Sequence, residues 1–386
     1  MKYFPEANIF LKQIFNHLLI TMENILKIAI TQGDGNGVGL ELALKTFAQE
    51  EMFEFCIPIL YANEKLLLFH RKTLGLGNVP YTLVSTPDEA EAGRLNLIAI
   101  DVEGVDVSVT FGKPDLASGR LALVAMEMAV KDAAEGKVDA IVACPIHLPA
   151  MPRELFPYKG IDDFLAAQLG GEALTLFCNP YMRVALATNH IPLSEVPSTL
   201  NAEMLEVRVR QALETVKRDF LCSAPRVAVL ALNPHAGAAG ILGADDEECV
   251  MPVVRKFEEE GKAGVFGPYA ADAFFGAAMY KHFDCVLALY HDQGATPFKT
   301  LSMTEGVQLI SGLKVACAAP SHGPAFDKAG KGEVDEASFR HAIYTVIDVT
   351  RHRLAYDAAR ANPLPPYTPQ HERMGGERRR FPAEAQ

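Results

Sequence analysis

Four histidines follow short apolar runs in this sequence, each in a loop rich in glycine, proline, asparagine or aspartate. They are His147, His190, His235 and His291. In open α/β sheets, ligands bind outside the carboxyl ends of the strands, so these loops are where a site is expected. A lone histidine in such a loop is more often structural, but four in one context favour a shared site. An imidazole can bind a divalent metal or transfer protons near neutral pH.

Two of these histidines lie in motifs with small neighbouring residues. His235 is part of NPHAG, and His291 is part of YHDQG. If their strands are neighbours, the two side chains can share a divalent cation, with nearby carboxylates completing the shell. Asp292 can be a metal ligand, or it can orient an imidazole by bonding to the ring nitrogen that does not bind the metal. The acids at 245–248 follow the first motif, and we expect most of them at a solvated helix start, where negative charge suits the helix dipole.

Lys299 lies eight residues after His291. It is either a surface lysine or a point charge for a phosphate or carboxylate. The residue pattern alone leaves both interpretations open.

Two glycine-rich loops could meet a ligand through backbone N–H groups. The first contains Gly33, Gly35 and Gly37, but it fits neither GxGxxG nor the P-loop. It is either a phosphate or carboxylate contact at a helix start or a tight strand–helix turn. The second loop, residues 321–332, includes His322 and Gly323 and could clasp a nucleotide.

The elements that must position these loops are strands alternating with helices. The apolar runs predict strands at 27–31, 138–143, 184–188, 226–232 and 285–290. Helical patterns cover 40–49 and 202–219. This alternation predicts a mostly parallel sheet covered on both faces, and hence an α/β fold.

Composition narrows the class of partner. The 386 residues carry 36 Lys+Arg against 48 Asp+Glu, a net charge of −12, which argues against binding to nucleic acid or to an anionic membrane. No apolar stretch is long enough for a membrane span. The seven cysteines form no CxxC pair, so we expect reduced thiols and a cytoplasmic protein. An anionic small substrate remains compatible, since a few local cations suffice.

Several motifs, taken in order and spacing, resemble the 4-hydroxythreonine-4-phosphate dehydrogenase family of pyridoxal-phosphate biosynthesis. The matching segments are ITQGDGNGVGLE (30–41), 143–147, 188–193, ALNPHAG (231–237), YHDQG (290–294) with Lys299, and SHGPAFDKAGKG (321–332). The resemblance implies an isocitrate/isopropylmalate dehydrogenase-like fold, with two α/β domains and an active-site cleft between them. It also implies a cytoplasmic homodimer whose site is shared across subunits.

The family's activity is oxidation of a secondary alcohol by NAD or NADP, followed by loss of CO₂. The resemblance implies a divalent cation (Zn, Mg or Co) on His235, His291 and a third histidine. It gives His147, Lys299 and Gln308 as substrate-binding positions and a small phosphorylated molecule as substrate. The candidates for contact with the nicotinamide cofactor come from the glycine-rich motifs: Gly33, Gly35, Gly37, Gly237, His322 and Gly323.

This chain departs from the family pattern at the site. Ile161 stands where the third metal histidine belongs, and isoleucine cannot ligate a metal, so Asp162 is a possible substitute. Leu148 replaces a basic residue, Gln308 replaces an asparagine, and Cys317 replaces an arginine. Cysteine cannot reproduce the bidentate anion recognition of arginine.

Two hypotheses follow from this comparison. The chain is a metal-assisted dehydrogenase acting on 4-phosphohydroxy-L-threonine or a related phosphorylated hydroxy acid. Alternatively, it keeps the fold, has lost or changed catalysis, and acts as a ligand-binding or partner protein.

We expect residues 1–21 to be an extension upstream of the natural start and residues 361–386 to be a flexible tail. A discontinuous first domain should combine 22–125 with 285–360. A central domain, 126–284, should supply most dimer contacts.

Overall fold

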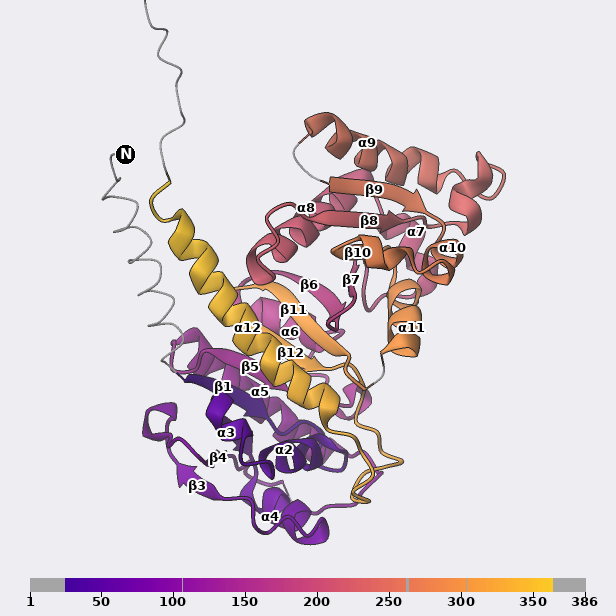
Figure 1. The fold of residues 1–386 in the computed structure, drawn as a ribbon. Coiled ribbons are helices and arrows are strands. Elements are labelled where there is room, and N and C mark those ends of the chain that lie inside the picture. Colours follow the sequence, from indigo (N-terminus) through magenta and orange to yellow (C-terminus); the bar gives the residue numbers. More distant parts are fainter. Residues whose placement is uncertain (1–24, 106, 262–263, 303, 364–386) are drawn as a thin grey trace, which may run out of the picture.

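The computed structural model describes residues 25–105, 107–261, 264–302 and 304–363, and its strands form one sheet (Figure 1). The twelve strands are β1 (Leu26–Thr31), β2 (Cys56–Ala62), β3 (Tyr81–Val84), β4 (Leu95–Ala99), β5 (Ala140–Ala143), β6 (Gly171–Cys178), β7 (Arg183–Leu186), β8 (Arg226–Leu230), β9 (Gly264–Tyr269), β10 (Cys285–Ala288), β11 (Val307–Leu313) and β12 (Ala316–Pro320). Their order across the sheet is β3-β4-β2-β1-β5-β12-β11-β6-β7-β10-β8-β9.

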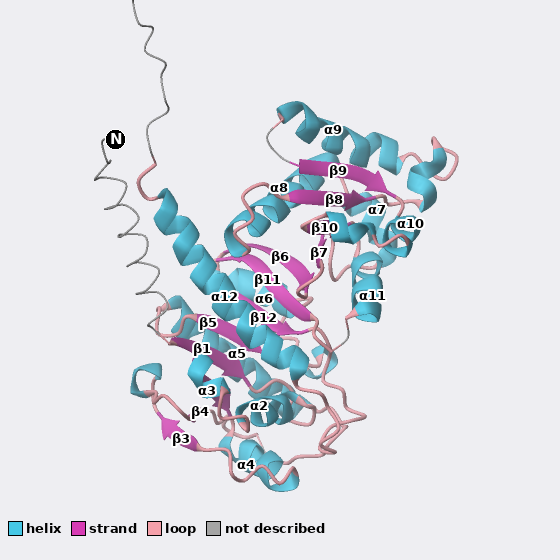
Figure 2. Ribbon diagram, viewed as in Figure 1, coloured by secondary structure: helices cyan, strands magenta, loops and turns pink. Residues whose placement is uncertain are grey.

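Helices lie on both sides of this sheet (Figure 2). They are α2 (Gly39–Phe47), α3 (Met52–Phe55), α4 (Glu64–Thr73), α5 (Leu116–Ala134), α6 (Ile161–Leu169), α7 (Val196–Thr199), α8 (Ala202–Asp219), α9 (Met251–Glu260), α10 (Ala271–Gly276), α11 (His291–Leu301) and α12 (Ala337–Arg360). The α/β class and the mostly parallel sheet predicted from the sequence are confirmed. None of the helices in the described part of the chain is long and apolar enough to cross a membrane.

The sheet consists of two parallel groups that run in opposite directions. Strands β3, β4, β2, β1, β5 and β12 form one group, and β7, β10, β8 and β9 form the other. Between them, β11 and β6 pair antiparallel with each other and with their neighbours. The middle of the sheet is therefore where loops from both groups can meet.

The predicted elements form for local reasons that the sequence shows. Helix α8 has the predicted bounds, because the Asn201 side chain caps it by accepting a hydrogen bond from the Met204 N–H at 2.9 Å. Glu203 in its first turn and Arg218 in its last both suit the helix dipole. The central strands are continuous apolar runs with both faces buried, as in β5 and β10.

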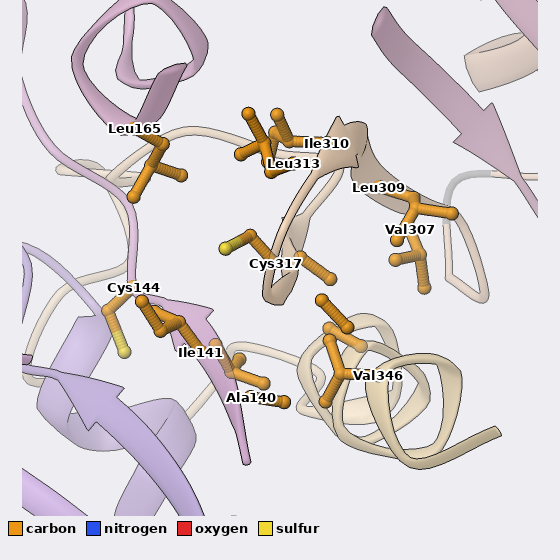
Figure 3. Close-up of a cluster of buried hydrophobic side chains, with 14 of the residues drawn as sticks. Ala140, Ile141, Cys144, Leu165, Val307, Leu309, Ile310, Leu313, Cys317 and Val346 are labelled. Carbon is orange, nitrogen blue, oxygen red and sulfur yellow. The ribbon is translucent and has the colours of Figure 1, made fainter. Parts of the chain in front are cut away.

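Part of the core lies where the two groups join. Side chains of β5, β11, β12 and α12 form a close-packed apolar cluster there (Figure 3). Cys317 lies within it, fully buried, and its thiol donates to the Val315 carbonyl oxygen at 3.5 Å. All seven cysteines are free, in agreement with the expected reduced thiols.

Strand pairing bears on the predicted domain edges. The edge at residue 285 would assign β10 to the first domain, but β10 pairs with β7 and β8 and so belongs with the central strands. The edge at 126 falls inside α5. Sequence alone could not show this, because strand order depends on contacts far apart along the chain. The division into two domains stays a prediction. The expectations for residues 1–21 and for 364–386 lie outside the described residues.

Candidate active site

A cavity of about 230 Å³ lies at the middle of the sheet, where loops of both strand groups meet. Its lining comes from the β5 loop, the start of α6, β6, the β7 loop, α11, β11 and the end of β12. The lining residues are Cys144, Pro145, Ile146, Leu148, Gly160, Ile161, Phe177, His190, His291, Lys299, Gln308, Ala319, Pro320, Ser321, His322 and Gly323. Several predicted site residues are therefore brought together: His291, Lys299, Gln308, His322 and Gly323.

Helix α11 carries two of these residues. His291 is its first residue, and its Nδ1 lies 2.7 Å from the Oδ1 atom of Asp292. That contact is the one expected if Asp292 orients the imidazole. Lys299 lies two turns further along the same helix, where its Nζ is 5.5 Å from the centre of the Phe177 ring.

Gly294 allows α11 to approach the sheet. A Cβ atom at this position would lie 2.8 Å from Val184 Cγ1 and 2.9 Å from both Ala288 Cβ and Leu186 Cδ2. These atoms belong to β7, β10 and the core between them. The glycine of the YHDQG motif therefore sets the distance between the sheet and the helix that carries His291 and Lys299.

We expect Gly294→Ala to destabilise the protein by about 1–3 kcal/mol, because the added methyl group overpacks this contact. Urea unfolding followed by circular dichroism measures the change. Gly276→Ala is the matched control, since a Cβ at Gly276, the last residue of α10, meets nothing within 4 Å. If both variants unfold at the same urea concentration, the close approach of α11 does not matter.

The ammonium group of Lys299 is desolvated. Burial lowers its pKa, and the charge of Asp292 offsets this only in part. Among the described residues, no carboxylate lies within ion-pair distance of its Nζ atom. A half-buried cation of this kind at a cavity wall is suited to bind an anion.

The β12 end of the cavity presents two unpartnered polar atoms. Ser321 Oγ and His322 Nε2 are buried, and neither has a hydrogen-bond partner in the described part of the chain. His322 Nδ1 lies 2.9 Å from the Gly323 carbonyl oxygen, so Nε2 is left as the acceptor of the neutral ring. Burial lowers the pKa of His322, which favours that neutral form. These atoms fit a ligand that carries hydrogen-bonding groups.

His147 lies beside the cavity rather than in its lining. Its half-buried ring packs edge-on against Phe326, with 5.2 Å between ring centres. The contact joins the β5 loop to the 321–332 loop. The predicted role of His147 in substrate binding stays a prediction.

The first glycine-rich loop is buried by the protein itself. A Cβ at Gly33 would lie 2.5 Å from the Pro145 carbonyl oxygen, and Gly33 has a φ of +68°. A Cβ at Gly35 would lie 2.8 Å from Leu66 Cδ1, and one at Gly37 would lie 2.9 Å from Pro324 Cβ. Packing within the protein thus explains why glycine is needed at these positions. This agrees with the interpretation of the loop as a tight strand–helix turn. None of the three lines the cavity.

The NPHAG loop lies outside the cavity as well. His235 is exposed, with a φ of +54°, and it is not among the lining residues. A Cβ at Gly237, which has a φ of +76°, would lie 2.7 Å from the Gly243 carbonyl oxygen. Gly237 is therefore required by the loop's own packing.

Within one subunit, the described residues do not group the metal ligands that the resemblance implies, and the site shared across subunits stays a prediction. Ile161 offers no donor atom, and Asp162 is turned into the protein, where it contacts Asn189, Thr175 and His190. No group of three or more His, Cys, Asp or Glu side chains within the described ranges is arranged to hold a metal ion. Only Oδ2 of Asp162 accepts hydrogen bonds from protein groups, and the role of Asp162 as a substitute ligand stays a prediction.

Two departures from the family pattern have visible consequences. Leu148 and Ile161 give the cavity an apolar wall. Cys317 lies in the apolar cluster and does not line the cavity. Neither of these positions therefore supplies a cation to the cavity.

Sequence reasoning overlooked one structural carboxylate. Glu247 and Glu248 are exposed, as expected, but Asp246 is fully buried. Its Oδ1 accepts a hydrogen bond from the Leu232 N–H at 2.7 Å, and its Oδ2 accepts one from the Asn233 N–H at 2.9 Å. Asp246 thereby fixes the loop that follows β8. A run of four acids gives no signal of which one turns inward.

Known proteins resemble this chain over most of its length. It is 43% identical over 344 residues to 4-hydroxythreonine-4-phosphate dehydrogenase of Bacteroides thetaiotaomicron, covering 89% of this chain and 93% of that protein. It is 33% identical over 338 residues to the enzyme of the same name from Prosthecochloris aestuarii, covering 84% and 98%.

Solved structures agree with this relationship. The crystal structure of 4-hydroxythreonine-4-phosphate dehydrogenase from Klebsiella pneumoniae superposes with a TM-score of 0.71 at 28% identity, covering 85% of this chain and 98% of that one. The enzyme from Burkholderia phymatum gives a TM-score of 0.66 at 31% identity, covering 85% and 99%. The model of one family, the pyridoxal phosphate biosynthetic protein PdxA, matches residues 54–346. The chain therefore belongs to the PdxA family.

Proposed function

We propose that this chain oxidises 4-phosphohydroxy-L-threonine, or a related phosphorylated hydroxy acid, with NAD or NADP as oxidant. Decarboxylation of the resulting β-keto acid follows. The observation that carries the proposal is the central cavity, which is lined by Lys299, whose ammonium is partly buried, and by His190, His291 and His322. A cation beside several imidazoles suits an anionic substrate whose hydroxyl must lose a proton.

The residues that line the cavity have separate roles in binding the substrate and the cofactor. Lys299 binds the phosphate or carboxylate as a point charge, and the amide of Gln308 on β11 hydrogen-bonds a polar group of the substrate. Leu148 and Ile161 contribute apolar side chains to the lining, which would limit the access of water. A nicotinamide bound at the cavity supplies the hydride acceptor. Ser321 and His322 supply the buried polar atoms that would meet it.

We also propose that a divalent cation assists the reaction, as the resemblance implies, with His235 and His291 as its ligands in a site shared between the subunits of the dimer. We expect chelation to lower turnover, since such an ion would polarise the reacting oxygen as a Lewis acid. The measurement is NAD(P)H formation by protein treated with EDTA, with and without added Zn²⁺, Mg²⁺ or Co²⁺. A rate that is unchanged by chelation would contradict this expectation.

The proposed function is tested by absorbance of the reduced nicotinamide, with each cofactor and a panel of phosphorylated hydroxy acids. The competing hypothesis of a ligand-binding protein predicts thermal stabilisation by these compounds without turnover. Failure of folded protein to reduce NAD or NADP with every member of the panel would overturn the dehydrogenase proposal. We also propose a homodimer, which light scattering of the purified chain tests.

A further inference from the structure

The connection between β12 and α12 begins at the cavity and then passes α2 (Figure 1). We call this connection, residues 321–336, the β12–α12 loop. Its first residues, Ser321, His322 and Gly323, line the cavity. The loop contains no helix or strand, so its backbone groups have no ladder of their own. Contacts with other elements must therefore fix its shape.

Glu41 of α2 contacts the far end of this loop. Its side chain is fully buried, and its Oε2 accepts a hydrogen bond from the Gly330 N–H at 3.1 Å. Burial raises the pKa of Glu41, and the backbone N–H groups of residues 330–334 that face it offset this only in part. A buried carboxylate is costly unless it is hydrogen-bonded, so the loop is what makes this position tolerable for an acid.

Lys45 lies one turn further along α2 and bonds to the carbonyl groups of the same segment. Its Nζ donates to the carbonyl oxygen of Gly332 at 3.4 Å and to that of Val334. It also lies 3.4 Å from Oε2 of Glu336, the last residue of the loop. A glutamate and a lysine four residues apart on a helix commonly pair with each other. Within the described part of the chain no ion pair joins Glu41 to Lys45, so both charges serve the loop.

The near end of the loop is held by the first glycine-rich loop. The Val38 N–H donates to the Pro324 carbonyl oxygen at 3.0 Å. A Cβ atom at Gly37 would lie 2.9 Å from that same oxygen, and one at Gly330 would overlap the ring of Phe111. The β12–α12 loop is therefore fastened at both ends to elements that lie outside the cavity.

The start of the loop offers groups that suit a large polar ligand. Ser321 Oγ and His322 Nε2 are buried and have no hydrogen-bond partner in the described ranges. A Cβ atom at Gly323 would meet nothing within 4 Å, so there is open space beside the backbone there. Free polar atoms next to open space fit the dinucleotide of the proposed function.

We propose that Glu41 and Lys45 are positioning residues for the dinucleotide, because they hold the β12–α12 loop in the conformation that binds it. The inference rests on the proposed function, in which this loop meets NAD or NADP. Neither residue lines the cavity, so both act on the cofactor through the loop alone. If only a fraction of the molecules has the loop in place, the apparent Kd rises by the inverse of that fraction.

The first measurement is binding of NADH and NADPH to the full chain, followed by the fluorescence of the reduced nicotinamide. Glu41→Gln keeps the size of the side chain, and Lys45→Met keeps most of its length. Each should raise Kd by about 10-fold, as expected for loss of a hydrogen bond to a charged group. Lys45→Arg keeps a cation that can donate to the same carbonyls, and it should retain most of the wild-type affinity.

Steady-state kinetics give a second, independent readout. In Glu41→Gln and Lys45→Met, the KM for NAD or NADP should rise in the same proportion as Kd. The KM for the phosphorylated hydroxy acid and kcat should change far less, because the groups that meet the substrate are untouched.

Glu206→Gln and Lys256→Met are the matched controls. These two side chains belong to α8 and α9 and pair with each other, with 2.6 Å between Lys256 Nζ and Glu206 Oε2. Replacing them removes the same two charges without contact with the loop. Dinucleotide affinity should therefore stay at the wild-type value. Circular dichroism checks that each variant folds.

Hydrogen exchange with mass spectrometry separates release of the loop from a general loss of stability. Amides of residues 324–334 should exchange faster in Glu41→Gln and Lys45→Met, whereas those of α8 should not. The proposal is overturned if the loop exchanges at the wild-type rate, or if it exchanges faster while Kd for both dinucleotides is unchanged. It is also overturned if binding of inorganic phosphate weakens as much as binding of NADH.

The fate of the proposed function is measured separately. A wild-type chain that binds NADH but oxidises no phosphorylated hydroxy acid refutes the dehydrogenase and leaves the positioning role of Glu41 and Lys45 intact. Turnover together with unchanged variants refutes the positioning role alone. A wild-type chain that binds neither dinucleotide refutes both.

Discussion

Replacing Asp219 with alanine is expected to lower the free energy of unfolding by about 3–5 kcal/mol, because it leaves a buried guanidinium without its partner. Asp219 ends α8, and Arg353 of α12 reaches it with Nε at 2.7 Å and an NH2 nitrogen at 2.8 Å. Ser311 Oγ of β11 donates to the same carboxylate at 2.6 Å. Both ionised side chains are buried, at 3% and 7% exposure.

The chain supplies a matched control for this prediction at the same helix junction. Arg218 of α8 and Asp357 of α12 form an ion pair at 2.7 Å, but Asp357 is exposed and Arg218 is partly exposed. Asp357→Ala should therefore change stability by only about 0–1 kcal/mol. Urea unfolding of the two variants measures the difference. Equal effects would show that burial of the Asp219–Arg353 pair is not what matters.

A double replacement sharpens the interpretation. Asp219→Leu combined with Arg353→Met removes both charges and fills the space with apolar atoms. Since the large cost arises from the unpaired charge, this variant should recover most of the stability lost in Asp219→Ala.

Lys299→Met is expected to reduce kcat/KM for a phosphorylated substrate by about 10²–10³-fold, since losing one partner of a buried charge pair costs roughly 2–5 kcal/mol. Methionine keeps the length and apolar stem of the side chain, so its contact with Phe177 survives. The loss should therefore report the missing charge. Calorimetry with inorganic phosphate tests the same point without turnover.

The control and the pH dependence follow from the surroundings of Lys299. Lys314 is exposed, so Lys314→Met should leave both measurements unchanged. Because burial lowers the pKa of Lys299, anion affinity should hold below that pKa. It should fall as the pH rises through it, at a lower pH than for an ordinary lysine near 10.4. Affinity that is indifferent to Lys299→Met would assign the anion to other groups.

Local patterns predicted much of the fold and part of the site. The capped, amphipathic sequence of α8 specified both of its ends, because helix limits depend on neighbouring residues. The apolar runs located β1, β5, β7, β8 and β10. The rule that ligands meet the ends of strands pointed to His190 and His291, which both line the cavity. Lys299 and Gln308 were assigned from the family resemblance, and they line the same cavity.

Long-range packing could not be predicted in the same way. Strand β10 lies between β7 and β8 although it follows them by many residues, and no local pattern encodes that order. The local sequence around Gly33, Gly35 and Gly37 is the same whether these glycines face a ligand or pack against Pro145, Leu66 and Pro324. The inward turn of Asp162 depends on how α6 packs against β6, which the local sequence could not reveal.

Strand β5 has a consequence for how the protein is made. One edge of β5 pairs with β1, which precedes it in the chain. The other edge pairs with β12, which is residues 316–320 and follows much later. On the ribosome, that second edge stays open until nearly the whole sheet has been synthesised. An unpaired apolar strand edge can pair with another chain and cause aggregation. Nascent chains of this protein should therefore depend on chaperones late in translation.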